Sequence, residues 1–266
     1  MSDAFANVYD DAERARAYDA LDFPGTYHLA FRDLPELIGT PLPGARALDF
    51  GCGAGRSTRF LQRLGFLTTG VDIAAPMLER ARARDPQGDY RLVLDGELGD
   101  LPAGAFALVL SAFTFDNIPT GERKAALLAG LARLLAPGGR LVNLVSAPEI
   151  YTHEWASFST RDFPENHTVR CGDRVRIVML DVEDRRPVED VLWTDEGYRE
   201  AYARAGLRLL ETRRPLGRAG EPFAWVSETT VAPWVIYLLA RDSADRPAAA
   251  PCSGAWTRPE TGGRKA

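Results

Sequence analysis

The chain has 266 residues, of which 45% are hydrophobic and 26% charged, an ordinary composition for a globular protein with one sizeable α/β domain. Its formal net charge of −5 argues against a broad nucleic-acid-binding face, and no apolar run reaches the roughly 20 residues of a transmembrane helix. The three cysteines form no C-x-x-C pair, so we expect neither a disulfide framework nor a metal site. We therefore expect a cytoplasmic protein, monomeric or homodimeric, with no nucleic-acid or membrane partner.

Residues 1–42 carry helical patterns and many aromatic side chains. The segment is acidic and broken by charges over residues 1–22, which is unlike a signal peptide. It either packs on the domain as extra helical structure or forms a lid over a bound ligand. We favour the lid, with Tyr9, Tyr18 and Tyr27 as its contributors to the site.

From residue 46 to residue 145, short apolar runs alternate with helical patterns, as in successive β–α units of a parallel sheet. The run at 105–111 is almost wholly apolar, which is typical of a strand buried on both faces. We expect a turn at Pro137-Gly138-Gly139 to end the last helix of this region. The expected strands are 46–50, 66–71, 90–94, 105–111 and 140–145, and the expected helices are 57–64, 75–84 and 122–135.

Residues 147–192 interrupt this rhythm. Apolar and charged residues alternate over 174–182 and 187–193, on either side of four charged residues, which predicts an antiparallel hairpin. Arg174, Arg176 and Asp181 then belong either to a pocket roof or to the solvated face of the hairpin. A helix at 196–205, strands at 207–213 and 233–240, and a disordered tail at 242–266 complete the prediction.

A glycine-rich loop, Asp49-Phe50-Gly51-Cys52-Gly53-Ala54-Gly55, follows the first expected strand. Such a loop lets a ligand approach bare backbone, because glycine has no Cβ. Arg56 stands where the dinucleotide fingerprint needs glycine, and no Gly-Lys-Ser/Thr of a phosphate-binding loop follows. Asp72 lies 21 residues after Gly51, a spacing that suits hydrogen bonds to ribose hydroxyls. Its alternative role is to cap the next helix.

This D-x-G-x-G-x-G pattern resembles motif I of the class I S-adenosylmethionine-dependent methyltransferases, and the resemblance extends over residues 44–146. It implies an α/β fold with a Rossmann-like, seven-stranded, mostly parallel sheet of order 3-2-1-4-5-7-6, in which strand 7 is antiparallel. Helices would cover both faces, with an N-terminal helical lid and an inserted β-hairpin. The implied domains are a lid at 1–42 and a cofactor-binding domain at 43–241, whose insertion at 147–192 caps the substrate side.

The resemblance also implies that S-adenosyl-L-methionine is the cofactor and assigns residues to it. Asp49 would bind its amino group, Asp72 its ribose, and Met77 would pack near its adenine. Asp95 would accept a hydrogen bond from the adenine amino group, unless it is a plain turn residue. The remaining implied cofactor contacts are Gly51, Cys52, Gly53, Gly55, Ile73, Gly96 and Ser111.

Ligands of open α/β sheets bind beyond the carboxyl ends of the strands, which places a second substrate above residues 111–117. Members of the resembled family that methylate DNA or amide nitrogens often carry an Asn/Asp-Pro-Pro-aromatic motif there. This chain lacks that motif, so the resemblance disfavours those two classes of methyl acceptor. A small molecule is the expected acceptor. Phe113, Asn143 and Tyr151 are its candidate contacts, although Asn143 has the alternative of a structural hydrogen bond.

Methyl transfer from a sulfonium is an in-line displacement, and it needs a general base only if the nucleophile arrives protonated. His153 is the candidate base, with a packing role as the alternative. Three functions remain open: methyl transfer, an intramolecular cyclisation or elimination that releases methylthioadenosine, and non-catalytic cofactor binding. We expect methyl transfer under a closed lid, driven mainly by proximity and orientation.

Overall fold

The computed structural model describes residues 24–94 and 98–242. Several expectations therefore lie outside the described residues. These are the lid residues Tyr9 and Tyr18, the adenine contacts Asp95 and Gly96, and the tail over 243–266.

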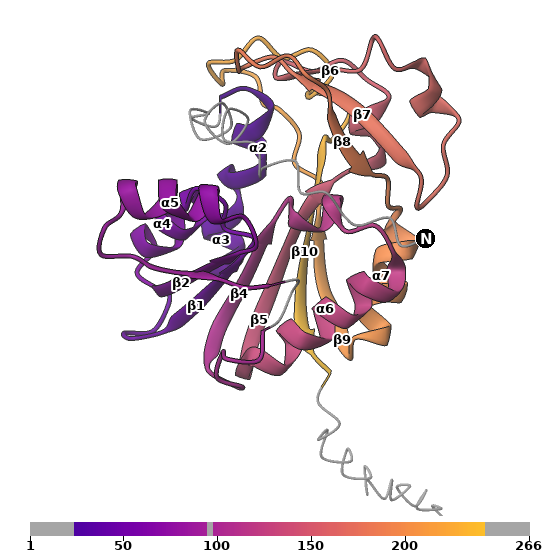
Figure 1. Ribbon diagram of the computed structural model, residues 1–266. Coiled ribbons are helices and arrows are strands. Elements are labelled where there is room, and N and C mark those ends of the chain that lie inside the picture. The colour runs from indigo at the N-terminus through magenta and orange to yellow at the C-terminus, as the bar shows by residue number, and fades with distance from the viewer. Residues whose placement is uncertain (1–23, 95–97, 243–266) are drawn as a thin grey trace, which may run out of the picture.

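A seven-stranded sheet of order β3-β2-β1-β4-β5-β10-β9 forms the centre of the molecule (Figure 1). The first five strands are parallel, and β10 runs antiparallel to both β5 and β9. This confirms the expected order, with the last strand of the chain as the antiparallel one. The strands are β1 (Arg46–Phe50), β2 (Leu67–Asp72), β3 (Asp89–Leu92), β4 (Phe106–Ala112), β5 (Leu135–Ser146), β9 (Leu207–Arg213) and β10 (Trp234–Arg241).

Helices cover both faces of this sheet, and each face has its own hydrophobic core. The side chains of β4 alternate between the two cores: Leu108 and Leu110 belong to one and Val109 to the other. This explains why the β4 sequence is apolar almost without interruption. The helices are α2 (Thr26–Arg32), α3 (Leu34–Ile38), α4 (Arg56–Arg63), α5 (Ala75–Arg84), α6 (Gly121–Leu134) and α7 (Asp195–Arg204).

Strand β5 corrects one expectation, since it begins at Leu135 directly after α6 and not at residue 140. Its pairing with β4 jumps from Phe106–Leu135 to Leu108–Arg140. Pro137-Gly138-Gly139 therefore lie in an irregularity within the strand, and Gly138 takes a φ of 74° there. The additional residues of β5 are accommodated as a bulge, because β4 pairs with β5 again from Leu108 and Arg140 onward.

The inserted hairpin is present and belongs to a small antiparallel sheet of order β6-β7-β8, here called the cap sheet. Its strands are β6 (Phe158–Ser159), β7 (Arg174–Met179) and β8 (Val188–Val191). In Figure 1 the cap sheet stands beyond the carboxyl ends of the parallel strands. The 3-10 turns η2 (Thr114–Asn117), η3 (Pro148–Tyr151) and η4 (Pro164–His167) complete this end of the molecule.

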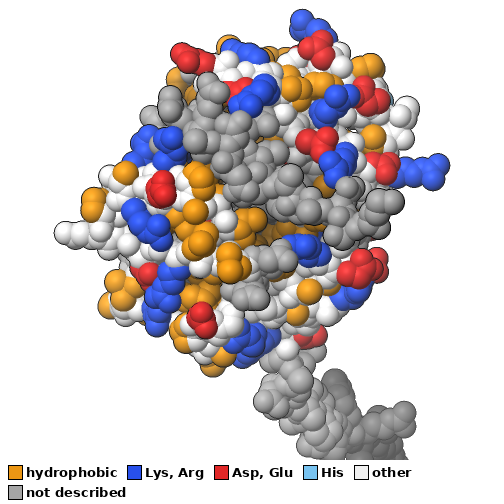
Figure 2. Space-filling model, in the orientation of Figure 1, with side chains coloured by type: hydrophobic (Ala, Val, Ile, Leu, Met, Phe, Trp, Pro, Cys, Tyr) orange, Lys and Arg blue, Asp and Glu red, His pale blue; other side chains and the backbone are white. Residues whose placement is uncertain are grey.

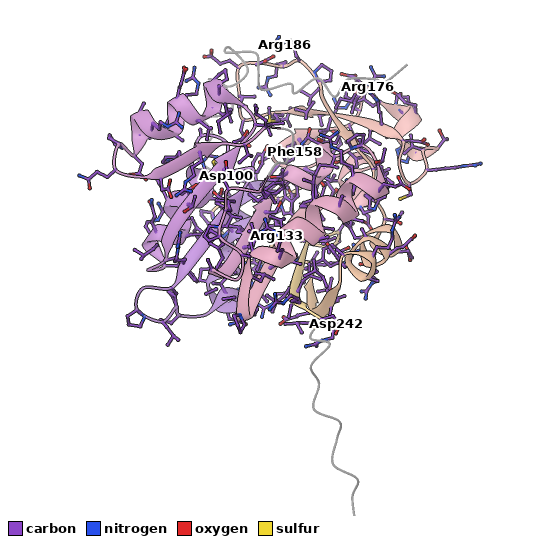
Figure 3. The ribbon with its side chains drawn as sticks, turned by 60° about the horizontal axis from the view of Figure 1, so that its bottom comes forward. Asp100, Arg133, Phe158, Arg176, Arg186 and Asp242 are labelled. Atoms are coloured by element: carbon purple, nitrogen blue, oxygen red, sulfur yellow. The ribbon has the colours of Figure 1, made fainter. Side chains whose placement is uncertain are left out.

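The cap sheet has an apolar inner face and a charged outer face. Val175, Ile177 and Met179 are buried, whereas the side chains of Arg174 and Arg176 are exposed and form ion pairs with Glu189 and Glu165. Figure 3 shows Arg176 and Arg186 at the periphery on the cap side, with Asp242 at the opposite end of the molecule. Arg174 and Arg176 therefore belong to the solvated face, as does the exposed Asp181.

Acidic and basic side chains are interspersed over the described part of the face shown in Figure 2. This mixed distribution agrees with the small net negative charge of the chain. The described part of this face carries no broad basic surface. Of the helices in the described ranges, none combines the length and apolar character needed to cross a bilayer.

Candidate cofactor and acceptor sites

The glycine-rich loop between β1 and α4 has a left-handed backbone at three positions, a conformation that favours glycine. Gly51, Gly53 and Gly55 have φ angles of 73°, 52° and 78°. A Cβ on Gly51 would lie 2.0 Å from Thr114 Oγ1, and one on Gly55 would lie 2.6 Å from the Tyr90 hydroxyl. At Gly51 and Gly55 the loop is therefore packed so closely against Thr114 and Tyr90 that a side chain would collide with them.

Asp49, at the end of β1, is completely buried beneath this loop. The hydroxyls of Ser57 and Thr58 each donate to its Oδ2 at 2.7 Å, whereas its Oδ1 accepts no hydrogen bond within the described residues. Burial raises the pKa of Asp49 to about 6, although the two hydroxyl hydrogen bonds act in the opposite direction. A buried carboxylate oxygen without a partner is costly, and a bound ammonium group would satisfy it. Asp49 thus fits the amino end of S-adenosylmethionine.

Asp72, at the end of β2, fastens the glycine-rich loop to the start of α5. Its Oδ2 accepts a hydrogen bond from the Gly53 amide at 2.7 Å, and its Oδ1 accepts one from the Ala74 amide at 2.8 Å. Met77 is buried with Ala54 and Ala74 close to Gly53, and Ile73 is exposed beside Asp72. These residues surround one side of the loop, where the resemblance implies the ribose and adenine.

Cys52 contributes its backbone to the loop, while its side chain belongs to the core. The thiol is buried with Leu78, Ala81 and Tyr90, and this burial raises its pKa well above the usual range. The Cys52 amide donates to the carbonyl of Val71 at 3.0 Å. Any contact of Cys52 with a cofactor would therefore involve its main chain.

Ser111 and Asn143 occupy paired positions on β4 and β5, and both are completely buried. The Asn143 amide donates to the Tyr202 hydroxyl of α7 at 2.9 Å. The Ser111 hydroxyl and the Asn143 Oδ1 have no hydrogen-bond partner within the described residues. Neither residue lines the pocket described below, so the geometry favours the structural role for Asn143.

The turn after β4 connects the glycine-rich loop with a pocket. Phe113 has a φ of 64°, the one left-handed conformation of a non-glycine residue within the described ranges. Such strain costs roughly 1–3 kcal/mol and is concentrated at functional sites. Phe113 lines the pocket, and the next residue, Thr114, contacts Gly51 and donates to the Phe50 carbonyl at 3.0 Å.

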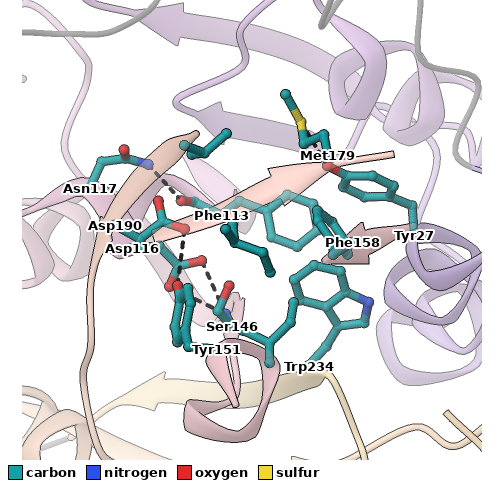
Figure 4. A pocket seen from close by; sticks show the side chains of 13 residues that line it. Tyr27, Phe113, Asp116, Asn117, Ser146, Tyr151, Phe158, Met179, Asp190 and Trp234 are labelled. Atoms are coloured by element: carbon teal, nitrogen blue, oxygen red, sulfur yellow. Dashed lines mark hydrogen bonds between the residues drawn. The ribbon is translucent and has the colours of Figure 1, made fainter. Parts of the chain in front are cut away.

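The pocket lies between the carboxyl ends of β4 and β5 and the cap sheet (Figure 4). Its unfilled space is about 460 Å³ when the open mouth is counted with it. Two of the expected acceptor contacts, Phe113 and Tyr151, line it, and so does Tyr27 of α2, which was expected to contribute to the lid. Its other side chains are Asp116, Asn117, Ser146, Ile150, Phe158, Ile177, Met179, Val188, Asp190 and Trp234.

One end of the pocket is acidic (Figure 4). The buried Asp116 accepts hydrogen bonds from the Ser146 amide through both carboxylate oxygens, at 3.2 and 3.0 Å. Asp190 of β8 accepts a hydrogen bond from the Tyr151 hydroxyl at 3.0 Å. Burial raises the pKa of Asp116, and it also keeps the Tyr151 hydroxyl protonated by raising its pKa well above the usual range.

A buried lysine lies behind the acidic end. The Lys124 ammonium donates to the Phe115 carbonyl and faces the rings of Trp193 and Tyr198, at 4.8 and 5.5 Å from their centres. Burial lowers its pKa, although the charge of Asp116 acts in the opposite direction. Lys124 compensates part of the negative charge of Asp116 without lining the pocket.

The structure does not bring His153 to the pocket. Its Nδ1 lies 3.1 Å from both the Thr152 hydroxyl and the Glu149 carbonyl, and its ring packs 5.9 Å from that of Trp155. His153 is absent from the pocket lining. The geometry therefore favours its packing role over that of a general base.

Sequence reasoning missed Asp190, Phe158 and Trp234 as pocket residues. The sequence contained a signal for Asp190. Asp190 lies two positions after Val188, so both side chains are on the inward side of β8, and a charged residue at such an inward position is unexpected in an alternating strand. Phe158 and Trp234 carried none, since nothing in their neighbourhoods indicates which distant segments they meet.

A family model described as "Methyltransferase domain" matches residues 48–143. The chain is 33% identical over 187 residues to the "Ubiquinone biosynthesis O-methyltransferase" of Nitrosococcus oceani, an alignment covering 66% of this chain and 73% of that protein. It is 35% identical over 104 residues to the protein of the same name from Xanthomonas oryzae, covering 38% of this chain. The chain matches only 42% of the length of that relative.

Solved structures share the fold. An S-adenosylmethionine-dependent methyltransferase from Mesorhizobium loti superposes with a TM-score of 0.58 at 22% identity, covering 82% of this chain and all of that one. Another from Clostridium acetobutylicum superposes with a TM-score of 0.56 at 14% identity, covering 88% of this chain and 96% of that one. At these identities the likeness concerns the fold alone.

Proposed function

The chain belongs to the class I S-adenosylmethionine-dependent methyltransferases, and on that basis we propose that it transfers the cofactor's methyl group to a small molecule held in the pocket. The observation that carries this proposal is the connection between the two sites. Thr114 contacts the glycine-rich loop, and its neighbour Phe113 lines the pocket. A molecule in the pocket therefore lies next to a cofactor bound on the loop.

We propose that the cofactor is held by residues of the β1 and β2 ends. Asp49 binds its ammonium group, the backbone of Gly51, Gly53 and Gly55 accommodates its methionine part, and Asp72 accepts ribose hydroxyls. Ile73 and Met77 flank the adenine, and Asp95 and Gly96 remain predicted partners of that ring. The bound cofactor supplies an electrophilic methyl group on a sulfonium, which transfers by in-line displacement.

The protein's part in this reaction is mainly to orient the acceptor and exclude water. Tyr27 of α2 donates a hydrogen bond to the Met179 sulfur of β7 at 3.4 Å, so helix and cap sheet meet over the pocket. We propose that they form the lid together with the predicted contributors Tyr9 and Tyr18. A closed, dry pocket favours transfer to the acceptor over side reactions with water.

The name of the relatives does not identify the methyl acceptor of this chain. Much of the pocket, including Tyr151, Phe158, Asp190 and Trp234, lies outside the 48–143 match to the methyltransferase family model. Because acceptor choice depends on these residues, similarity within the cofactor-binding region is no guide to it.

The proposal is tested with purified protein, methyl-labelled S-adenosylmethionine and a panel of small hydroxy and amino compounds. We expect S-adenosylhomocysteine to form together with a labelled product, both followed by chromatography. Release of methylthioadenosine without any labelled acceptor would instead establish the intramolecular use of the cofactor. Tight cofactor retention without turnover across the panel would overturn methyl transfer and favour a non-catalytic role.

A further inference from the structure

We propose that Asp116 is the general base that takes the proton from the acceptor's nucleophilic group while the methyl group is transferred. The inference rests on the proposed function, because it requires the pocket to hold the acceptor. His153, the base expected from the sequence, lies outside this pocket, whereas Asp116 lines it (Figure 4). The acceptor is then a compound whose O–H or N–H group arrives protonated.

Asp116 belongs to the turn that connects the two proposed sites. Its amide donates to the carbonyl of Phe113 at 3.3 Å, which closes the 3-10 turn η2. Thr114 of the same turn contacts Gly51 and donates to the Phe50 carbonyl at 3.0 Å. Asp116 therefore lies two positions after the residue that touches the glycine-rich loop. A base on this turn is held next to the loop on which the cofactor is proposed to bind.

Two neighbouring groups hold the Asp116 carboxylate in one orientation. The Ser146 amide donates to both of its oxygens, at 3.2 and 3.0 Å, and the Tyr198 hydroxyl of α7 donates to Oδ1 at 3.5 Å. A general base is effective only if its lone pair is aimed at the proton that it removes. These hydrogen bonds come from β5 and α7, and they fix the carboxylate relative to the wall of the pocket.

The surroundings of Asp116 adjust its affinity for a proton. Burial raises its pKa above the ordinary range of an aspartate, while the charge of Lys124 and the donors of Ser146 and Tyr198 act in the opposite direction. A base is most effective when its pKa is close to the working pH, because it is then both ionised and strongly basic. Lys124 of α6 does not line the pocket, so it acts through Asp116 and is a positioning residue.

The other titratable groups that face Asp116 in the described part of the chain are less suited to the role. Burial raises the pKa of the Tyr151 and Tyr198 hydroxyls well above the usual range, so both stay protonated and act as donors. Asp190 accepts the Tyr151 hydroxyl at 3.0 Å and belongs to β8 of the cap sheet. Asp116 is therefore the pocket carboxylate carried by the segment that also contacts the glycine-rich loop.

The step balances in atoms and charge. The acceptor oxygen or nitrogen forms a bond to the methyl carbon as the carbon–sulfur bond of the sulfonium breaks, and the electron pair of that bond remains on sulfur. The acceptor proton passes to a carboxylate oxygen of Asp116 and leaves to water after the product has dissociated. Removal of this proton during the displacement avoids a positively charged acceptor atom in the product.

The test measures methyl transfer to the acceptor identified from the panel, at saturating S-adenosylmethionine and over a range of pH. We expect Asp116→Asn to lower kcat at least about 100-fold with little change in KM. The wild-type kcat/KM for the acceptor should fall as the pH decreases through the pKa of Asp116, and this decline should be missing in the variant. Glu122→Gln, at an exposed position of α6, is the matched control and should behave like the wild type. A folded Asp116→Asn protein with the kcat of the wild type would overturn the inference.

Two further measurements decide even if Asp116→Asn does not fold. Lys124→Met removes a positive charge near Asp116, so the decline in kcat/KM should shift to higher pH. NMR of the protein labelled in its aspartate carboxyl groups and saturated with S-adenosylhomocysteine should show one carboxyl that titrates at the midpoint of this decline. Both values should move together in Lys124→Met. A decline that Lys124→Met leaves in place would overturn the inference.

The outcomes separate this inference from the proposed function. Methyl transfer that persists undiminished in Asp116→Asn would overturn the role of Asp116 and leave methyl transfer standing. Release of methylthioadenosine without any labelled acceptor would overturn methyl transfer, and with it the premise of this inference. Transfer that requires Asp116 and follows its titration would support both.

Discussion

Asp49 is the residue on which cofactor binding is expected to depend most. Its carboxylate is completely buried, with Ser57 and Thr58 bound to one oxygen and no partner within the described residues for the other. Burial raises its pKa to about 6, so the charge needed to bind an ammonium group is present only at higher pH.

Cofactor affinity should therefore fall as the pH decreases through about 6, because a proton on Asp49 then competes with the cofactor ammonium. Isothermal titration with S-adenosylhomocysteine between pH 5 and 8 measures this, and we expect Kd to rise by about tenfold per pH unit below 6. Asp49→Asn should bind weakly and lose the pH dependence. Asp100→Asn, at an exposed position, is the control. A flat profile for the wild type would contradict this role.

The same group affects stability with a definite sign. The folded pKa of Asp49 lies above the unfolded value, so the unliganded folded state binds the proton more tightly. Its contribution to stability is therefore present below about pH 4 and is lost as the pH rises through 6. Unliganded Asp49→Asn should accordingly gain stability relative to the wild type at pH 7.5, and this gain should vanish near pH 4.

At the scale of elements, α2 is attached to the cap region through a buried carboxylate. Glu228, in the segment before β10, accepts hydrogen bonds from the Thr26 hydroxyl at 2.5 Å, the Ala156 amide at 2.7 Å and the Val226 amide at 2.8 Å. Thr26 and Ser157 also exchange two hydrogen bonds of 3.0 Å. These contacts hold Tyr27 at the pocket.

Glu228→Gln should lower the free energy of unfolding by about 1–3 kcal/mol, because its amide nitrogen would face a buried N–H donor. Urea unfolding followed by circular dichroism measures this change. Glu200→Gln, on the exposed side of α7, should change stability by less than about 0.5 kcal/mol. If α2 is part of the lid, Glu228→Gln should also raise the acceptor KM more than it lowers kcat. If the Glu228→Gln and Glu200→Gln proteins were equally stable, the hydrogen bonds of Glu228 would not be what attaches α2 to the cap region.

At the scale of the whole molecule, both proposed ligand sites lie at one end of the sheet. The loops after β1 and β2 form the proposed cofactor site, and those after β4 and β5 meet the cap sheet at the proposed acceptor pocket. Ligand sites gather at this end because all parallel strands deliver their carboxyl ends there. Binding at this end should therefore stabilise the cooperative fold.

S-adenosylhomocysteine at 100 times its Kd should stabilise the protein by about 2.7 kcal/mol and raise Tm by about 5–10 °C. Differential scanning fluorimetry measures this. NAD⁺ at the same concentration should leave Tm unchanged, because Arg56 replaces the glycine of the dinucleotide fingerprint. Asp49→Asn should show a much smaller increase. Equal shifts with both ligands would contradict the assignment of the loop.

Most elements could be predicted because their signals are local, whereas the order of the central sheet was implied by the family resemblance. The apolar run of β4 indicates burial on both faces, and the hairpin over β7 and β8 is visible from alternation. The predicted start of β5 was wrong because the sequence Pro137-Gly138-Gly139, taken by itself, indicates a turn. Whether a strand continues past it depends on how β4 pairs, and that pairing is absent from the local pattern.

The cofactor loop and the acceptor pocket differ in how far the residue order alone could describe them. The glycines with left-handed backbones and the spacing from Gly51 to Asp72 are constraints between residues close in sequence. The cofactor loop could therefore be predicted from the sequence itself. The pocket instead joins Tyr27, Asp190 and Trp234 from α2, β8 and β10. Their meeting depends on burying apolar surface between segments far apart in sequence, which is a property of the folded molecule as a whole. For the same reason His153, close to the site in sequence, lies outside the pocket.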